Sequence, residues 1–312
     1  MTPNAFFAGN PRDWPVYQTA LPDAFARAGI SVNLLAETDD PASVDYIIYA
    51  PSSAIQDFTP FTRLKAVLNL WAGVEGMRMN QTLKVPLTRM VETGMTAGMA
   101  EWVLGHVMRH HLGMDAHILG QDGAWRNEMT PPLAKQRVVG LLGLGALGSA
   151  CGDLLNKVGF QVKGWSRRAK SLPGIECLSG EDGLESLLRS AEILILLVPL
   201  TGETENVLNA ARLAMLPRGA VIINPGRGPL IDDTALLAAL DSGQIGHATL
   251  DVFRVEPLPV DHAFWAHPHV TVTPHIASAT RAQSASDTIA ENIRRGEAGE
   301  PYLYLVDRLA GY

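Results

Sequence analysis

The chain has 312 residues, of which 47% are hydrophobic and 18% charged, a composition that suits a globular protein with two domain-sized cores. Its net charge of -7 argues against nucleic acid or an anionic membrane surface as a partner, because both attract basic surfaces. Two cysteines are too few for a disulfide framework, and the longest strictly apolar run, Ile193 to Leu200, is too short to span a bilayer. With no signal peptide pattern at the N-terminus, we expect a cytoplasmic protein.

Short apolar runs alternate with helical patterns over the first hundred residues. Four runs predict strands: AFFA (5–8), SVNLLA (31–36), DYIIYA (45–50) and LKAVLNL (64–70). This alternation is typical of a parallel sheet covered by helices. Small and apolar residues at helical spacing then predict one long helix over about 97–119, which we interpret as the connection into a second domain.

The alternation restarts at Arg137 with six runs that predict buried strands. They are RVVGLLG (137–143), FQVKGWS (160–166), ILILLVP (193–199), AVIINPG (220–226), HATLDVF (247–253) and VTVTPH (270–275). Six strands with a glycine loop after the first indicate a doubly wound dinucleotide fold. We therefore expect an α/β protein with two doubly wound domains. One is a smaller flavodoxin-like substrate domain, formed by 1–98 with a returning tail, 279–312. The other is a six-stranded parallel Rossmann domain, 99–278, which includes most of the connecting helix.

A glycine-rich loop directly follows the first of these strands. Its residues, in G-x-G-x-x-G order, are Gly143, Leu144, Gly145, Ala146, Leu147 and Gly148. The first glycine permits a tight turn, the second lets the backbone approach a pyrophosphate, and the third lets the helix pack on the strand. The N-terminus of that helix favours phosphate groups. The motif is weak alone, but its place between a strand and a helix predicts a dinucleotide site.

The next strand ends without the acidic residue that usually binds the adenosine ribose. Ser166 lies about 18 residues after Gly148, where that acid is expected, and Arg167 and Arg168 follow it. A carboxylate would repel a 2′-phosphate, whereas a hydroxyl and guanidinium groups would donate to it. The sequence thus predicts NADP as cofactor, with NADPH preferred over NADH. The alternative is two solvated arginines on a loop.

Three further motifs follow strands in the same half and carry Arg227, Glu256 and His275. Ligands of open α/β sheets bind beyond the carboxyl ends of the strands, where these motifs lie. Reduction of a 2-oxo acid needs a cation for the carboxylate, which Arg227 supplies in a fork geometry. It also needs a proton donor, for which His275 suits neutral pH, and Glu256 would orient the imidazole. Each residue alone has an ordinary structural explanation, but their combination behind a dinucleotide loop favours catalysis.

The chain resembles the D-isomer-specific 2-hydroxyacid dehydrogenases, and within them the glyoxylate/hydroxypyruvate reductase A branch. The motifs that carry the resemblance are GLGALG, WSRR, NPGRG, LDVFRVEPLP, TPHIA and the C-terminal DRLAGY. It implies that Arg227, Glu256 and His275 form the catalytic set. It also implies a cytoplasmic homodimer, with the long helix near the dimer contact, and further cofactor-binding residues: Pro199, Asn224, Pro225 and Asp251.

By the same resemblance, backbone N–H groups of Ala72, Gly73 and Val74 bind the substrate carboxylate. Trp71 is a departure, because a smaller residue is expected there; it either shapes the substrate pocket or packs as a structural residue. The resemblance implies NADPH-dependent reduction of glyoxylate to glycolate and of hydroxypyruvate to D-glycerate. Trp71 leaves open a reductase of bulkier, phenylpyruvate-like 2-oxo acids. A binding module that senses NAD(P) is the alternative outside enzymes.

Histidines four residues apart, His106 and His110, lie on the predicted long helix with His111 and His117 nearby. Such a pair can bind zinc, but no acid or third ligand lies at a recognisable spacing. We expect surface or interface histidines and no metal, because hydride transfer does not require one.

Overall fold

The computed structural model describes residues 2–125, 127 and 130–308, and its chain forms two compact units. The first unit comprises 1–95 and 279–312, and the second comprises 96–278. The last four residues of the DRLAGY motif, 309–312, lie outside the described residues. Among the helices that are described, every one is too short or too polar to cross a membrane.

A five-stranded parallel sheet forms the centre of the first unit, in the order β2-β1-β3-β4-β5. Its strands are β1 (Asn4–Ala8), β2 (Asn33–Leu35), β3 (Tyr46–Tyr49), β4 (Ala66–Asn69) and β5 (Leu87–Thr88). This is the flavodoxin-like order expected for the smaller domain. The first four strands fall in the predicted runs, whereas β5 was not predicted, because two residues at a sheet edge give no periodicity.

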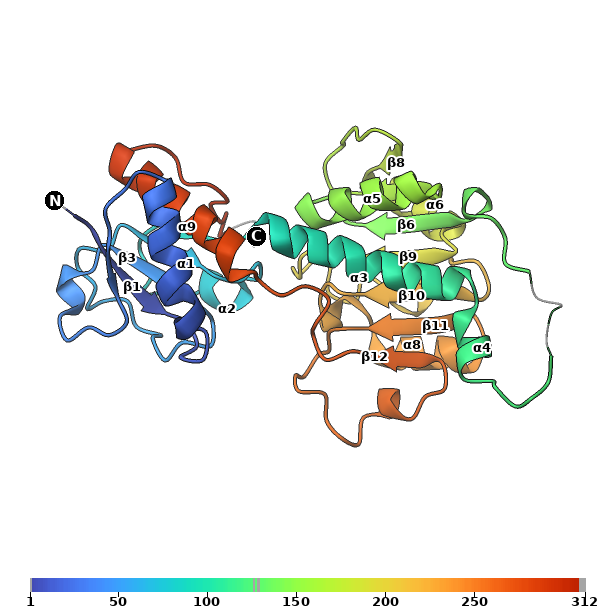
Figure 1. Ribbon diagram of the computed structural model, residues 1–312. Helices are drawn as coiled ribbons and strands as arrows, with labels where there is room; N and C mark the ends of the chain where they lie inside the picture. Colours follow the sequence, from blue (N-terminus) through green and yellow to red (C-terminus); the bar gives the residue numbers. More distant parts are fainter. Residues whose placement is uncertain (1, 126, 128–129, 309–312) are drawn as a thin grey trace. The chain divides into compact units, whose positions relative to one another are not determined.

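The side chains of this sheet alternate between two cores, because successive strand residues point to opposite faces. Phe7, Tyr46 and Leu68 face one core. The helices α1 (Trp14–Arg27) and α9 (Ala282–Ala298) pack on that face of the sheet (Figure 1). Ile47 and Val67 face the other core, to which Met77 of α2 (Glu75–Arg78) belongs. A short 3-10 helix, η1 (Pro41–Ser43), precedes β3. The sheet is therefore covered on both faces, as a doubly wound domain requires.

The second unit has a seven-stranded parallel sheet, in the order β12-β11-β10-β9-β6-β7-β8. Its strands are β6 (Val138–Leu142), β7 (Gln161–Trp165), β8 (Ile175–Leu178), β9 (Ile193–Leu196), β10 (Ala220–Asn224), β11 (Ile245–Leu250) and β12 (Val270–Val272). Six strands match the predicted runs, so the predicted count was one short. The missed strand, β8, lies at the edge, where Glu176 is exposed and only the first of its four residues is buried, so its apolar pattern is too short to recognise.

Helices cover both faces of this sheet as well. Leu141 and Ile195 pack on the side of α3 (Thr93–His111) and α5 (Ala146–Val158), and Figure 1 shows these two helices in front of the strands. Leu142 and Leu196 face the opposite core. That core also receives α6 (Gly180–Ser190), α7 (Ala210–Leu213) and α8 (Asp233–Asp241). The remaining 3-10 helices are η2 (Ala134–Gln136), η3 (Gly228–Leu230) and η4 (Ala263–Trp265).

The single long helix predicted over about 97–119 is in fact two helices. α3 ends at His111, and the five-residue α4 (Met114–Ile118) follows it. Between them Gly113 has a φ of 61°, a left-handed conformation that interrupts a helix and that glycine adopts without strain. The apolar spacing continues through the break, which is why periodicity alone did not detect it.

A buried carboxylate, Glu92, joins the two places where the chain passes between the units. It accepts backbone N–H groups of Gly94 (2.5 Å) and Met95 (2.6 Å) at the start of α3. It also accepts the N–H of Arg281 (3.1 Å) and the hydroxyl of Ser284 (2.5 Å) at the start of α9. One side chain therefore caps two helices that begin about 190 residues apart, where free N–H groups and the helix dipoles favour negative charge.

Candidate active site and cofactor loop

The glycine loop has the geometry of a turn that leaves room for a ligand. Gly143 has a φ of 117°, and a Cβ there would lie 2.6 Å from the backbone of Leu197. A Cβ at Gly148 would collide with the carbonyl oxygen of Gly143, so the helix α5 can approach β6 only with glycine there. At Gly145, by contrast, a Cβ would meet no protein atom within 4 Å. The first and third glycines are thus needed for packing, whereas the second faces open space, which fits a bound pyrophosphate.

The SRR stretch begins directly after β7. The hydroxyl of Ser166 donates to the carbonyl of Arg168 at 2.7 Å, which closes a small loop. Arg167 forms an ion pair with Glu203 at 3.8 Å. Sequence reasoning missed Lys170, whose ammonium donates to the carbonyl of Leu144 within the glycine loop at 2.5 Å. A third basic residue so close to the two arginines was the available signal. The donors and cations present fit an anionic group at this end of β7.

His275 and Glu256 are in contact, although they come from different loops. The imidazole Nδ1 lies 2.7 Å from one carboxylate oxygen of Glu256, Oε2, and the other oxygen, Oε1, accepts the N–H of Phe253 at 2.9 Å. The side chain of His275 is 52% exposed, so its ring is open to a ligand. With Nδ1 held by a carboxylate, Nε2 is the nitrogen left to exchange a proton with a substrate.

Asp251 holds the loop that carries His275. Its carboxylate is fully buried and accepts the hydroxyl of Thr273 (2.6 Å) and the N–H groups of Ile276 (2.9 Å) and Ala277 (2.8 Å). Its own carbonyl accepts the N–H of His275 at 2.9 Å. These bonds surround His275, whose φ of 54° lies in the left-handed region. A left-handed backbone is unfavourable for a residue other than glycine, and the hydrogen bonds to Asp251 on either side of His275 stabilise it.

The loop of Arg227 packs against the loop of Glu256. A Cβ at Gly228 would collide with the backbone of Phe253, so these two loops approach as closely as backbones can. Asn224, at the end of β10, is buried and its side-chain amide donates to the carbonyl of Arg227 at 2.9 Å. Pro225 is buried beside it. Thus the second unit brings together the loops of all three predicted catalytic residues.

Pro199, the remaining predicted cofactor residue, follows β9. Its carbonyl accepts the hydroxyl of Thr204 at 2.6 Å, which fixes the loop after this strand. The predicted carboxylate loop belongs instead to the first unit. There Trp71 is 48% exposed, Ala72 and Gly73 are half-buried and Val74 is buried.

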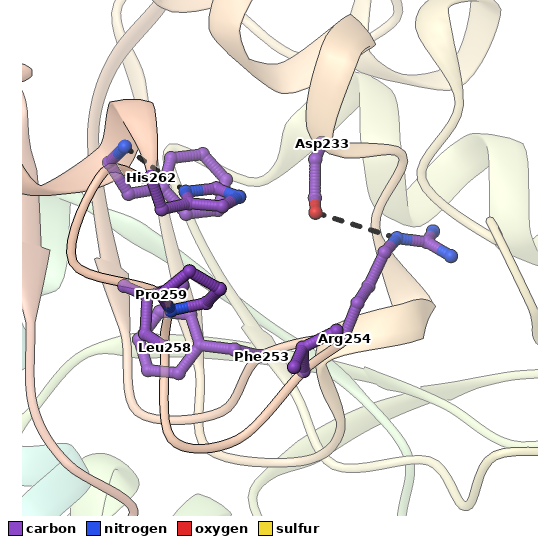
Figure 2. Close-up of a pocket in the computed structure, with 8 residues that line it drawn as sticks. Asp233, Phe253, Arg254, Leu258, Pro259 and His262 are labelled. Atoms are coloured by element: carbon purple, nitrogen blue, oxygen red, sulfur yellow. Dashed lines mark hydrogen bonds and ion pairs between the residues drawn. The ribbon is translucent and has the colours of Figure 1, made fainter.

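A pocket of about 230 Å³ lies on the loop after β11, beside the segment that carries Glu256. Figure 2 shows the Asp233 carboxylate facing the Arg254 guanidinium, 3.6 Å away, with His262 and Pro259 also lining the pocket. Burial raises the pKa of Asp233 although Arg254 opposes this effect. Arg254 also donates to the carbonyl of Ile231 at 2.5 Å. The contacts join this loop to the start of α8 and so support the position of Glu256.

The helical spacing pairs His106 with His110, but in the structure His110 clusters with other residues. His110 lies beside His247 of β11 and Asp115, with candidate ligand atoms within 4.8 Å of one another, and His106 is not in this group. Arg109 donates to both oxygens of Asp115, at 2.6 and 2.9 Å, so a cation already pairs with the carboxylate. His247 lies 137 positions from His110, and no spacing rule relates them. The absence of a metal stays a prediction.

A family model, the NAD binding domain of the D-isomer specific 2-hydroxyacid dehydrogenases, matches residues 102–277. Glyoxylate/hydroxypyruvate reductase A of Serratia proteamaculans is 41% identical over 258 residues, 80% of this chain and 82% of that protein. The protein of the same name from Yersinia enterocolitica is 39% identical over 256 residues, with the same coverage. The chain therefore belongs to the D-isomer specific 2-hydroxyacid dehydrogenase family.

Solved structures add similarity over the whole chain. A D-isomer specific 2-hydroxyacid dehydrogenase from Xanthobacter autotrophicus, in complex with NADPH and MES, is 40% identical with a TM-score of 0.91. An NADPH-dependent glyoxylate/hydroxypyruvate reductase from Sinorhizobium meliloti, in complex with NADP and sulfate, is 34% identical with a TM-score of 0.87. Each comparison covers 100% of both chains. The α/β fold with a Rossmann unit, expected from the sequence, is confirmed.

Proposed function

We propose that this protein reduces glyoxylate to glycolate and hydroxypyruvate to D-glycerate with NADPH. The observation that carries the proposal is the 2.7 Å contact between His275 and Glu256, in the unit that also holds the Arg227 and glycine loops. The relatives named as glyoxylate/hydroxypyruvate reductases support the same substrates, and the neighbours crystallised with NADPH and NADP support the cofactor.

His275 is the proton donor in the proposed mechanism. NADPH, when bound, would supply the hydride that the carbonyl carbon accepts. The Nε2 proton of His275 passes to the carbonyl oxygen, and Glu256 stabilises the imidazolium before transfer and holds the ring orientation. Arg227 binds the carboxylate and carbonyl oxygens through its planar guanidinium. In the reverse direction the same imidazole is the base.

The cofactor is held by the glycine loop and the end of β7 in this proposal. The backbone around Gly145 and the start of α5 bind the pyrophosphate. Ser166, Arg167 and Arg168 bind the 2′-phosphate. Pro199, the Asn224–Pro225 backbone and Asp251 are the residues that would hold the nicotinamide end, and the Asp251 carboxylate accepts three donors from the His275 loop. The second domain, 99–278, is then the NADP-binding domain.

For the first domain, 1–98 with 279–312, we propose binding of the substrate carboxylate by the N–H groups of Ala72, Gly73 and Val74. Trp71 borders this loop and favours larger substrates. The names of the relatives, which are glyoxylate/hydroxypyruvate reductases, weigh against such substrates. We also propose a homodimer in the cytoplasm. The free state of both cysteines suits a reducing compartment, and exposed apolar residues after α3, such as Leu119 and Trp125, suit a contact with a second copy.

Steady-state kinetics with NADPH over a panel of 2-oxo acids tests the proposal. We expect kcat/KM for glyoxylate and hydroxypyruvate to exceed that for phenylpyruvate. A fast aryl or branched substrate beside poor turnover of both small acids would overturn the substrate assignment. Lack of NADPH oxidation with every 2-oxo acid would favour the sensing module instead.

A further inference from the structure

Among the described residues, three consecutive backbone N–H groups of the loop after β4 have no acceptor. They belong to Ala72, Gly73 and Val74, and no hydrogen bond from them occurs in the part of the chain that the structure describes. Backbone N–H groups in partly buried segments are almost always paired. A run of three such groups is therefore a place where an anion or water completes the hydrogen bonding.

The side chain of Asn69 lies beneath this run. It is fully buried at the end of β4, and its amide donates to the carbonyl of Trp71 at 2.8 Å and to the carbonyl of Gly73 at 3.0 Å. Its own oxygen has no partner among the described residues. The carbonyl of Trp71 also accepts the N–H of Met90 at 3.0 Å. Both amide hydrogens of Asn69 are thus used to hold alternate carbonyls of the loop.

The planarity of the peptide bond turns these contacts into an orientation. In a trans peptide the C=O of one residue and the N–H of the next point in opposite directions. With the carbonyls of Trp71 and Gly73 drawn toward Asn69, the N–H groups of Ala72 and Val74 point away from it. Two N–H groups with a common direction and one residue between them suit the two oxygens of a carboxylate.

We propose that Asn69 is a positioning residue, which fixes the loop backbone so that the N–H groups of Ala72 and Val74 receive the substrate carboxylate. The inference rests on the proposed function for the identity of the anion. It assigns no contact between Asn69 and substrate, because Asn69 acts through the loop. Its effect falls on binding of 2-oxo acids and not on binding of the cofactor, whose predicted residues lie in the other unit.

The test compares Asn69→Leu, which keeps the approximate volume and removes the donors, with Asn69→Ser, which fits the same space and keeps one donor. Thr280→Val is the matched control, because the Thr280 hydroxyl holds the carbonyl of Leu70 at 2.8 Å, just before the N–H run. Binding of oxamate, an unreactive carboxylate analogue, to the full chain with NADPH present is measured by calorimetry. KM and kcat for glyoxylate and the Kd of NADPH are measured beside it.

We expect Asn69→Leu to weaken oxamate binding and raise KM for glyoxylate by about tenfold or more. Without the Asn69 amide, the loop N–H groups lose the orientation in which they donate to the carboxylate, and hydrogen bonds to a charged group are lost. Asn69→Ser should lie between, and the Kd of NADPH should stay within about twofold in all variants. Thr280→Val should match the wild type. If Asn69→Leu does not fold, Asn69→Ser decides.

Two results would overturn the inference. One is that folded Asn69→Ser and Asn69→Leu proteins bind oxamate with the wild-type Kd and keep the wild-type KM for glyoxylate. Any decrease in total activity would then reflect only a smaller fraction of folded, active molecules. The other is a wild-type chain that does not bind oxamate. Failure of the proposed function looks different, because a wild type that binds oxamate but reduces neither glyoxylate nor hydroxypyruvate refutes the reaction and leaves the loop assignment standing.

Discussion

The contact between His275 and Glu256 can be tested at the level of the single residue. His275→Ala removes the proton donor, and we expect kcat to fall by about a hundredfold to ten-thousandfold, the range typical of a general acid. The Kd of NADPH should change little, because the glycine loop is intact. Glu256→Gln keeps a hydrogen bond to Nδ1 without the charge and should cost less. Turnover that survives unchanged in His275→Ala would remove it from the mechanism.

The residues after β7 should determine the choice between the two nicotinamide cofactors. In a variant with Ser166→Asp, Arg167→Gln and Arg168→Gln, a carboxylate that repels the 2′-phosphate replaces groups that attract it. We expect the ratio of kcat/KM for NADPH to that for NADH to fall by about a hundredfold, or some 2.7 kcal/mol. Arg189→Gln, which removes an exposed arginine paired with Glu185 on α6, is the control. An unchanged ratio would place the phosphate-binding residues elsewhere.

At the scale of elements, the packing of α3 against β11 makes stability depend on pH. Burial, with the nearby His247 and Arg109 charges, lowers the pKa of His110 from 6.5 to about 3. Burial and Arg109 lower that of His247 from 6.5 to about 4. Asp115 opposes both shifts, and His106, His267 and His269 are also near. Below pH 6.5 the unfolded chain therefore takes up protons that the folded chain excludes.

Because the unfolded state binds more protons in this range, the free energy of unfolding should fall as pH drops from about 6.5 toward 4. Tm measured from pH 7 to pH 5 should decrease, and the variant His110→Gln with His247→Gln should show a shallower slope. His117→Gln, at an exposed position of α4, should keep the wild-type slope. Parallel slopes for wild type and double variant would contradict the assignment.

Elements were predictable from sequence where their signal was local. The glycine loop, its flanking strand and its helix lie within one short stretch, so local spacing was enough to find them. β8 and β5 are edge strands of four and two residues, too short to show a periodic apolar pattern, and the break at Gly113 interrupts no apolar pattern. The joining of His110 to His247 depends on how α3 lies on the sheet. So does the packing of Gly228 on Phe253. Such contacts between distant segments leave no mark in residue spacing.

For the whole molecule, the proposed homodimer predicts a twofold mass in solution. Leu119 is 80% exposed and Trp125 is 92% exposed. Large apolar side chains left exposed close together in the sequence suit an interface with a second copy. We expect light scattering after gel filtration to give a dimer, and Leu119→Ser with Trp125→Ser to shift it toward monomer. Val260→Ser, at an apolar residue that is 97% exposed in the second unit, is the control. A wild-type monomer at micromolar concentration would refute the proposal.

The position of Glu92 has a consequence for how such a chain can change over evolution. Because one carboxylate binds both the outgoing segment at Met95 and the returning segment at Arg281, the first unit presents two chain ends side by side. Everything from 96 to 278 then has the character of an insertion between neighbouring ends, the arrangement in which domain exchange disturbs a host least. A different cofactor-binding unit could be joined there by recombination, provided that the new segments keep the two capped helix starts.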